Sequence, residues 1–153
     1  MPKLLIDNQP LSYEELQEFY KHFDDMAVSL DDELFDAINA SAEEVNRVLA
    51  ADKVVYGINT GFGMLASKKI PSEDLRTLQK SLVLSHATGV ADELSHAEVA
   101  LVILLKVQSL TRGYSGIRLL VIERLIAFIN HGIYPCIPSK GSVGASGDLA
   151  PLA

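Results

Sequence analysis

The chain has 153 residues, of which 48% are hydrophobic and 22% charged, and its formal net charge is -7. This size and composition are ordinary for a globular domain with a packed core and argue against a disordered chain. Residues 1–50 hold twelve acidic and three basic side chains, whereas residues 51–153 hold eight and ten. Neither part has a strong basic patch, so binding to nucleic acid is disfavoured.

The apolar segments are too short to place the chain in a membrane. The longest apolar run is Val99–Leu105, whereas a helix needs roughly 20 apolar residues to span a bilayer. The segment Met1–Asp7 contains too few apolar side chains for the core of a signal peptide. We therefore predict a cytoplasmic protein with no membrane partner.

Cysteine and histidine give no sign of a metal centre. Cys136 is the only cysteine, which excludes an internal disulfide, and the four histidines have no metal-ligand spacing with it. Because Cys136 stands between Pro135 and Pro138, we expect a small buried side chain at this position. The sequence therefore predicts no bound metal.

In chain order, the sequence predicts a mainly α-helical fold with short strands near the start. Extended pieces are expected at Lys3–Asp7 and Lys53–Ile58. Helix starts are indicated where a serine is followed three residues later by a glutamate, the pattern of a capping box. This pattern occurs at Ser12/Glu15, Ser41/Glu44 and Ser95/Glu98.

A further helix is expected to open at Pro71-Ser72. At helical spacing, four of its side chains fall on one face and should form its packed stripe. These are Leu75, Leu78, Leu82 and His86.

Two long apolar helices are predicted in the second half. Residues 95–112 are apolar nearly all round, which is typical of a buried helix. Residues 113–116 separate this helix from a second one, which begins at Ile117 and ends near Asn130, before His131-Gly132. In a short chain the outer faces of both helices are left uncovered, so we expect poor solubility or self-association.

The segment Gly141–Pro151 contains a possible backbone electrophile. In a tight bend, the Gly147 nitrogen can attack the Ala145 carbonyl carbon, since glycine has no Cβ to obstruct the approach. Loss of two water molecules then leaves an imidazolone ring that carries a methylidene group from Ser146. Asp148 is placed to polarise the amide or to assist dehydration. An ordinary glycine- and serine-rich loop is the alternative interpretation.

Other glycine motifs fit the sequence poorly. A serine-hydrolase elbow would need glycine where Asp148 stands, and a phosphate-binding loop would need Gly-Lys-Ser/Thr after the glycines. Residues 61–66 match a dinucleotide-binding pattern, but Pro71 leaves little room for the helix that should follow.

The segment Gly141–Pro151 resembles, residue for residue, the prosthetic-group signature of the histidine/phenylalanine ammonia-lyase family, whose members build a methylidene-imidazolone from Ala-Ser-Gly. Residues 56–63 (YGINTGFG) and 81–89 (SLVLSHATG) are similar to the same family. The resemblance therefore runs from about residue 50 to the end. It implies the helical ammonia-lyase fold, a longer chain and a homotetramer. The apolar stretch Leu149–Ala153 at the end of the sequence also leads us to expect a longer chain. We interpret residues 1–153 as a single N-terminal region of such a protein.

The resemblance also implies roles for individual residues. Tyr56 matches the base that removes the β-proton of the substrate. Ser85-His86 matches the pair that contacts the substrate side chain, and Ser-His at this place is typical of histidine-selective members. Gln108 departs from the family, in which asparagine is usual. The expected supporting residues are Asn59, Gly63 and Asp148.

These patterns together predict an ammonia-lyase that converts L-histidine into urocanate and ammonia through a ring formed from Ala145, Ser146 and Gly147, without metal or nucleotide. Later segments of the family supply further catalytic groups, so residues 1–153 alone are expected to be inactive. Two alternatives remain open. One is a tyrosine or phenylalanine ammonia-lyase or an aminomutase of the same family, and the other is a non-enzymatic helical fragment with an uncyclised loop.

Overall fold

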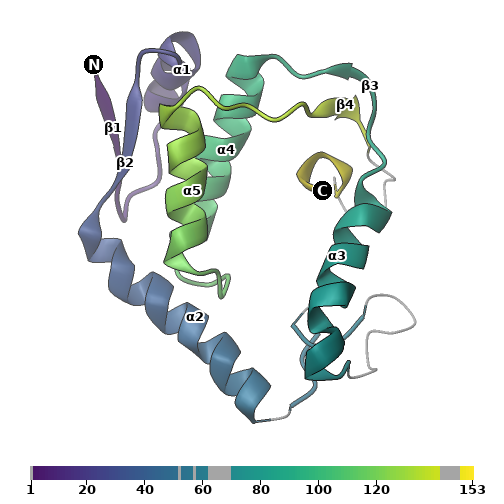
Figure 1. The fold of residues 1–153 in the computed structure, drawn as a ribbon. Helices are drawn as coiled ribbons and strands as arrows, with labels where there is room; N and C mark the ends of the chain where they lie inside the picture. The colour runs from purple at the N-terminus through teal and green to yellow at the C-terminus, as the bar shows by residue number, and fades with distance from the viewer. Residues whose placement is uncertain (1, 52, 57, 62–69, 142–148) are drawn as a thin grey trace. The chain divides into compact units, whose positions relative to one another are not determined.

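The computed structural model describes residues 2–51, 53–56, 58–61, 70–141 and 149–153. They form two compact units: unit 1 comprises residues 1–44 and 94–136, and unit 2 comprises residues 45–93 and 137–153. Most described residues are helical and the strands are short (Figure 1), which confirms the predicted mainly α fold. Within the described ranges, no helix is both long and apolar enough to cross a bilayer.

Unit 1 begins with a pair of parallel strands. Strand β1 (Lys3–Ile6) pairs with β2 (Ala27–Leu30) in a register that places Lys3 opposite Ala27. Parallel neighbours require a crossover connection, and helix α1 (Tyr13–His22) lies within it. The predicted strand at the start of the chain is therefore confirmed, whereas β2 was not predicted.

Helix α1 starts as the sequence predicted. The Ser12 hydroxyl accepts a hydrogen bond from the Glu15 N–H at 3.2 Å, and the Glu15 carboxylate accepts one from the Ser12 N–H at 2.7 Å. This reciprocal pair satisfies two backbone donors that a helix N-terminus leaves without partners. Phe19 is fully buried and is the anchor of α1 in the core of unit 1.

The centre of unit 1 is formed by α4 (His96–Leu110) and α5 (Leu119–Asn130), which lie side by side (Figure 1). A capping box at Ser95 and Glu98 starts α4, as predicted. The α4 side chains that reach the core are Val99, Ala100, Ile103, Leu104, Val107 and Leu110, and those of α5 are Ile122, Ile126 and Ile129.

Three turns next to these helices have backbone conformations that favour glycine. Gly113 and Gly116, which lie between α4 and α5, have φ angles of 74° and 65°, and Gly132, which follows α5, has a φ angle of 62°. These are left-handed values that glycine adopts without the steric cost of a side chain. The predicted end of α5 near Asn130 is confirmed, whereas α4 ends at Leu110, before residue 112, and α5 begins at Leu119, after Ile117.

Helix α2 (Phe35–Ala50) shows that the helix start predicted at Ser41 is wrong. It follows a short 3-10 helix, η1 (Asp32–Leu34), whose Asp31 carboxylate accepts a hydrogen bond from the Glu33 N–H at 3.0 Å. Ser41 lies inside α2, and its hydroxyl instead accepts a hydrogen bond from the Gly116 N–H at 2.9 Å. The helix therefore begins earlier than the serine pattern indicated.

In unit 2, η3 (Ser72–Asp74) leads into helix α3 (Leu75–His86). None of the α3 side chains is fully buried. The four that are half-buried are the predicted stripe, Leu75, Leu78, Leu82 and His86. Strand β3 (Val90–Glu93) then pairs antiparallel with β4 (Pro138–Lys140), and η4 (Ala150–Leu152) lies near the end of the chain.

Two further predictions are wrong. Residues 53–55 have no regular structure instead of forming a strand, and a turn follows at Tyr56, in which the backbone nitrogens of Ile58 and Asn59 both lie 3.2 Å from the Val55 carbonyl oxygen. Cys136 is exposed instead of buried, and the apolar residue that is buried here is its neighbour Ile137, at 7% exposure.

Candidate active site

The described parts of all three predicted motifs belong to unit 2. Tyr56 and Asn59 lie in the turn before residue 61, Ser85 and His86 end α3, and the residues that flank the Ala-Ser-Gly run follow β4. The remaining predicted site residues lie outside the described part of the chain, and these are Gly63, Ala145, Ser146, Gly147 and Asp148.

Asn59 braces the turn that carries Tyr56. Its Oδ1 accepts a hydrogen bond from the Val55 N–H at 2.9 Å, and its Nδ2 donates one to the Lys53 carbonyl at 2.7 Å. The Asn59 side chain is buried, whereas Tyr56 is 60% exposed. Such side-chain bonds to nearby backbone compete with extended structure. They explain why this segment is a turn and leave the phenol of Tyr56 at the surface of the described chain.

Thr60 is a residue of this turn that sequence reasoning missed. It is only 1% exposed, and its hydroxyl finds no hydrogen-bond partner within the described chain. A buried hydroxyl without a partner costs about 1–3 kcal/mol. Thr111 in unit 1 is equally buried, but its hydroxyl donates a hydrogen bond to the Gln108 carbonyl at 2.9 Å. Nothing in the sequence distinguishes these two threonines.

Ser85 and His86 are held by the last turn of α3. The Ser85 hydroxyl donates to the Leu82 carbonyl at 2.9 Å, and the Nδ1 of His86 lies 2.7 Å from the same carbonyl oxygen and 3.1 Å from the Ser85 hydroxyl. Since a carbonyl oxygen only accepts, this distance assigns the hydrogen to Nδ1. In the neutral ring, Nε2 is therefore a hydrogen-bond acceptor.

The β3–β4 pair connects the end of the His86 motif to the start of the Ala-Ser-Gly run. Val90 lies opposite Lys140 in the antiparallel register. A Cβ added to Gly141 would lie 3.6 Å from the Cα of Gly89 and only 2.6 Å from the Cβ of Ala150. The chain therefore returns to Gly141 after passing through the Ala-Ser-Gly run. The sequence identified the run but not this contact between its flanks.

The described residues contain no cluster of three or more histidine, cysteine, aspartate or glutamate side chains that could hold a metal ion.

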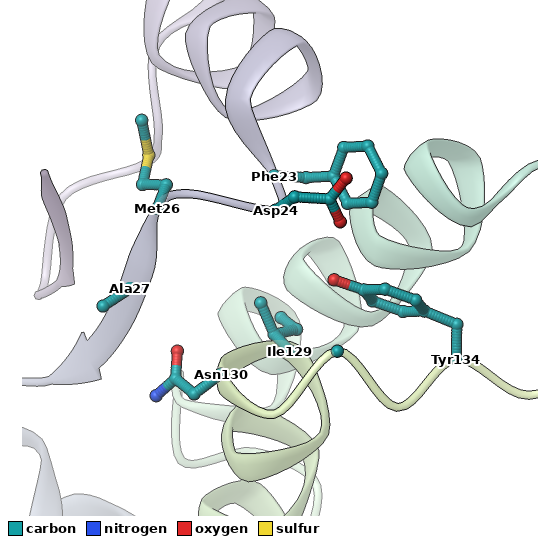
Figure 2. A pocket seen from close by; sticks show the side chains of 8 residues that line it. Phe23, Asp24, Met26, Ala27, Ile129, Asn130 and Tyr134 are labelled. Carbon is teal, nitrogen blue, oxygen red and sulfur yellow. The ribbon is translucent and has the colours of Figure 1, made fainter. Parts of the chain in front are cut away.

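A small cavity of about 60 Å³ lies in unit 1 (Figure 2). It is lined by residues of segments 23–27 and 129–134, which contain none of the three motifs. Its lining includes Asp24, Asn130 and Tyr134. Burial, together with the negative charge of Asp24, raises the pKa of the Tyr134 hydroxyl.

Comparison with known proteins agrees with the motifs. The histidine ammonia-lyases of Salmonella arizonae and Salmonella typhimurium are each 57% identical to this chain over 143 residues, which cover 94% of this chain and 28% of theirs. The chain thus spans little more than a quarter of the length of these curated relatives.

Solved structures share the fold. Histidine ammonia-lyase from Trypanosoma cruzi is similar at 31% identity with a TM-score of 0.85, over 98% of this chain and 28% of that one. Phenylalanine aminomutase from Pantoea agglomerans is similar at 31% identity with a TM-score of 0.86, over 99% and 28%. The family model for aromatic amino acid lyases matches residues 11–153 and so includes all three motifs. The chain belongs to the aromatic amino acid lyase family.

Proposed function

We propose that the complete protein is an ammonia-lyase that converts L-histidine into urocanate and ammonia, at a site to which unit 2 contributes. The observation that carries this proposal is the 57% identity to the Salmonella histidine ammonia-lyases. Because the chain spans 28% of their length, the other catalytic groups are assigned to the rest of the protein. Residues 1–153 alone are therefore expected to be inactive.

The residues on both sides of the Ala-Ser-Gly run lie in close contact with each other. A Cβ added to Gly141 would lie only 2.6 Å from the Cβ of Ala150, so there is no room for a side chain at position 141. A methylidene-imidazolone formed from Ala145, Ser146 and Gly147 would supply an electron sink, which makes the β-proton of the substrate easier to remove. Asp148 is proposed to assist the dehydration, and no metal or nucleotide is needed.

Tyr56 is the proposed base for the β-proton. Asn59 makes two hydrogen bonds to the backbone of the same turn. These bonds fix the backbone that carries Tyr56 and thereby help to orient the base. Work as a base near neutral pH requires groups that stabilise phenolate. We assign these groups to the rest of the complete protein. Gly63 is proposed to give the same loop its freedom to turn.

Ser85 and His86 are proposed to contact the side chain of the substrate. The Leu82 carbonyl holds the Nδ1 hydrogen of His86, which makes Nε2 the acceptor of the neutral ring. An N–H group of the histidine imidazole is a suitable donor for this nitrogen. The phenyl ring of phenylalanine offers no such donor, which supports histidine as the substrate.

The complete protein is further proposed to be a cytoplasmic homotetramer whose small-molecule partner is its amino acid substrate, without a nucleic-acid or membrane partner. Within a tetramer, neighbouring copies would cover the apolar surface of α4 and α5. Leu105, Leu120 and Phe128 on these helices are exposed in the chain as described.

The substrate is tested by incubating the full-length protein separately with histidine, tyrosine and phenylalanine and identifying the products. Urocanate as the main product supports the proposal. An unsaturated acid formed preferentially from tyrosine or phenylalanine would instead indicate another member of the family, and a β-amino acid would indicate an aminomutase.

Two variants test the chemistry in the same protein. Tyr56→Phe removes the proposed base and should reduce kcat by at least about 100-fold, whereas unchanged turnover would reject this assignment. Ser146→Ala cannot form the methylidene group, so retention of wild-type turnover would remove the electrophile from the mechanism. Intact mass then separates a closed ring from an uncyclised loop, because ring closure removes two water molecules.

A further inference from the structure

The unit 1 cavity lies where two turns of the chain meet. Figure 2 shows it between the turn that joins α1 to β2, which carries Phe23 and Asp24, and the turn after α5, which leads to Tyr134. Its volume of about 60 Å³ exceeds the roughly 10–15 Å³ that a single water molecule requires. The cavity therefore has room for a ligand of a few heavy atoms.

Tyr134 presents a buried hydroxyl group to this space. Its oxygen is shielded from solvent and has no hydrogen-bond partner among the residues described. Asp24 also lines the cavity, with its carboxylate toward the Tyr134 hydroxyl in Figure 2. Burial and the negative charge of Asp24 raise the pKa of this hydroxyl, so the two groups interact although no direct hydrogen bond joins them. Because a buried polar group without a partner is unfavourable, the space is suited to a ligand that pairs with both groups.

The chemistry of these two groups favours a cation that donates hydrogen bonds. A carboxylate only accepts hydrogen bonds, and a phenol oxygen accepts them as well. A ligand that bridges Asp24 and Tyr134 must therefore supply the N–H or O–H groups, and a positive charge on it complements the carboxylate. Charge-assisted hydrogen bonds of this kind are the stronger class.

The aromatic rings around the cavity favour an ammonium group over a metal ion. Phe23 and Tyr134 have ring centroids 5.7 Å apart, and His96 packs on Tyr134 with centroids 5.3 Å apart. The faces of aromatic rings attract ammonium groups, whereas Mg²⁺ and Ca²⁺ require six or more oxygen ligands. Among the described lining residues, Asp24 supplies the one carboxylate, and both ends of the Asn130 amide already bind backbone.

The charge of the surrounding chain acts in the same direction. Residues 1–50, most of which belong to unit 1, hold twelve acidic and three basic side chains. A region dominated by one sign of charge raises the local concentration of ions of the opposite sign. Cations are therefore the class of small ion that this part of the chain concentrates.

We propose that the unit 1 cavity binds a small cation of the ammonium class, which donates hydrogen bonds to the Asp24 carboxylate and to the Tyr134 oxygen. Met26 and Ile129 supply apolar wall, so methylammonium should be accepted as well as ammonium. The inference goes beyond the proposed function, because none of the three motifs lines the cavity. Ammonium is also the ionised form of the ammonia that the proposed reaction releases, so the site would meet this ion during turnover.

The experiment measures cation binding to the full-length protein by isothermal titration calorimetry, with sodium chloride holding the ionic strength constant. The probes are the chlorides of ammonium, methylammonium and potassium at about pH 7.5, where histidine side chains of ordinary pKa, about 6.5, are mostly neutral. We expect ammonium and methylammonium to bind with a Kd on the order of 1–10 mM. Potassium has the same charge but no hydrogen to donate, so it should bind at least about 10-fold more weakly.

Two variants remove the proposed contacts one at a time. Asp24→Asn removes the charge and should weaken ammonium binding at least about 10-fold, because hydrogen bonds to charged groups are the stronger ones. Tyr134→Phe removes the second acceptor, keeps the aromatic ring and should weaken binding about 2- to 10-fold. Asp24 is exposed, so its replacement should not disturb folding, which circular dichroism of the same samples checks.

The controls separate this cavity from a general attraction of cations to an acidic surface. Asp25→Asn removes the same charge from the adjacent residue, which does not line the cavity, and should leave the Kd unchanged. Tyr114→Phe should do the same, since Tyr114 is 92% exposed. Equal weakening by Asp24→Asn and Asp25→Asn would overturn the inference. So would equal affinity for potassium, no binding to the wild type, or binding that neither Asp24→Asn nor Tyr134→Phe weakens.

The proposed function and this site fail separately. The proposed function is judged by the product that the full-length protein forms from histidine, whereas the site is judged by the difference between Asp24→Asn and Asp25→Asn in ammonium affinity. A protein that forms urocanate but shows no such difference keeps the proposed function and loses the site. A protein that shows the difference but forms no urocanate keeps the site alone.

Discussion

The side-chain amide of Asn130 forms two hydrogen bonds with the backbone of Val28. Its Oδ1 accepts from the Val28 N–H at 2.8 Å, and its Nδ2 donates to the Val28 carbonyl at 2.8 Å. The last residue of α5 thus pairs with the middle of β2 in the way a neighbouring strand would. An edge strand left open is a template for pairing with other chains, and Asn130 occupies this position on β2.

We expect Asn130→Ala to destabilise unit 1 by about 2 kcal/mol, because two partly buried hydrogen bonds are lost at roughly 1 kcal/mol each. Hydrogen exchange should show the Val28 amide exchanging faster, together with a lower midpoint in urea. Asn130→Asp is the matched control, since it retains an acceptor for the Val28 N–H. An unchanged exchange rate at Val28 in the alanine variant would contradict the role of Asn130.

Gly113 and Gly132 allow backbone strain to be separated from steric clash. Both have positive φ, but a Cβ on Gly113 would lie 3.0 Å from the Ala37 carbonyl oxygen, whereas one on Gly132 has nothing within 4 Å. Gly132→Ala should cost about 1–2 kcal/mol, the cost of the left-handed conformation. Gly113→Ala should cost more, because Ala37 must also move. Equal losses of thermal stability in the two variants would show that the contact with Ala37 does not add to the cost of Gly113→Ala.

The capping box of α4 should make the free energy of unfolding depend on pH in the acid range. Hydrogen bonds from the Ser95 side chain and backbone lower the pKa of Glu98 below its usual value. The corresponding stability is present above the pKa of the unfolded carboxyl group and is lost as pH falls through the lower folded value.

Ser95→Ala should cost about 1 kcal/mol at neutral pH, as is typical for an N-cap serine, and should flatten the acid dependence. Thermal unfolding at several pH values between 3 and 7, a window set by the usual carboxyl pKa of about 4.3, measures both effects. Ser12→Ala serves for comparison, because Ser12 caps α1 in the same way. An acid dependence identical to that of the wild type would exclude the Glu98 contribution.

Tyr134 is expected to make unit 1 sensitive to alkali. Burial and Asp24 raise the pKa of its hydroxyl, so the neutral phenol is favoured in the folded state. This stability is present below the ordinary phenol pKa of about 10 and is lost as pH rises through the raised folded value.

Tyr134→Phe should therefore unfold at a higher pH than the wild type. At neutral pH the substitution should cost little, because this hydroxyl has no hydrogen-bond partner among the residues described. Tyr114→Phe is the matched control, since Tyr114 is 92% exposed. The prediction is rejected if both variants shift the alkaline transition equally.

Asn59 is expected to matter for turnover as well as for stability. In the full-length protein, Asn59→Ala frees the Val55 N–H and the Lys53 carbonyl and releases the turn that carries Tyr56. We expect kcat for histidine to fall about 10- to 100-fold, and the loss of two hydrogen bonds to lower the free energy of unfolding by about 2 kcal/mol. Wild-type kcat in this variant would show that the brace does not position the base.

Several elements could be predicted because the chemistry that forms them is local. Ser12 and Ser95 each cap a helix with a glutamate three residues away, and both boxes form. The half-buried stripe of α3 follows helical periodicity alone. Gly132 ends α5 with positive φ, a local property of glycine.

The wrong helix start concerns a residue whose partner is distant in sequence, whereas the missed turn after Lys53 is made by local hydrogen bonds of Asn59. Ser41 has the same local pattern as Ser12, but it lies within α2 and its hydroxyl binds the Gly116 N–H. Strand β4 is only three residues long and depends on β3 for its pairing. Cys136 was expected to be buried from its neighbours alone, but the buried residue is Ile137, and the sequence does not show which of two adjacent residues points inward.

The candidate site divides in the same way. Tyr56, Ser85 and His86 were identified from motifs in which the residue types themselves indicate chemistry. Gly141 belonged to the recognised run, but a sequence does not distinguish a glycine needed for left-handed backbone from one needed for a close contact. Ala150 has no reactive side chain, and its close contact with Gly141 is visible only in the folded chain.

The absence of any fully buried side chain in α3 has a calorimetric consequence. The heat capacity change of unfolding scales with the apolar area exposed to water, so melting α3 contributes little to it. A scanning experiment on residues 1–153 would therefore record mainly the cooperative transition of the α4 and α5 core.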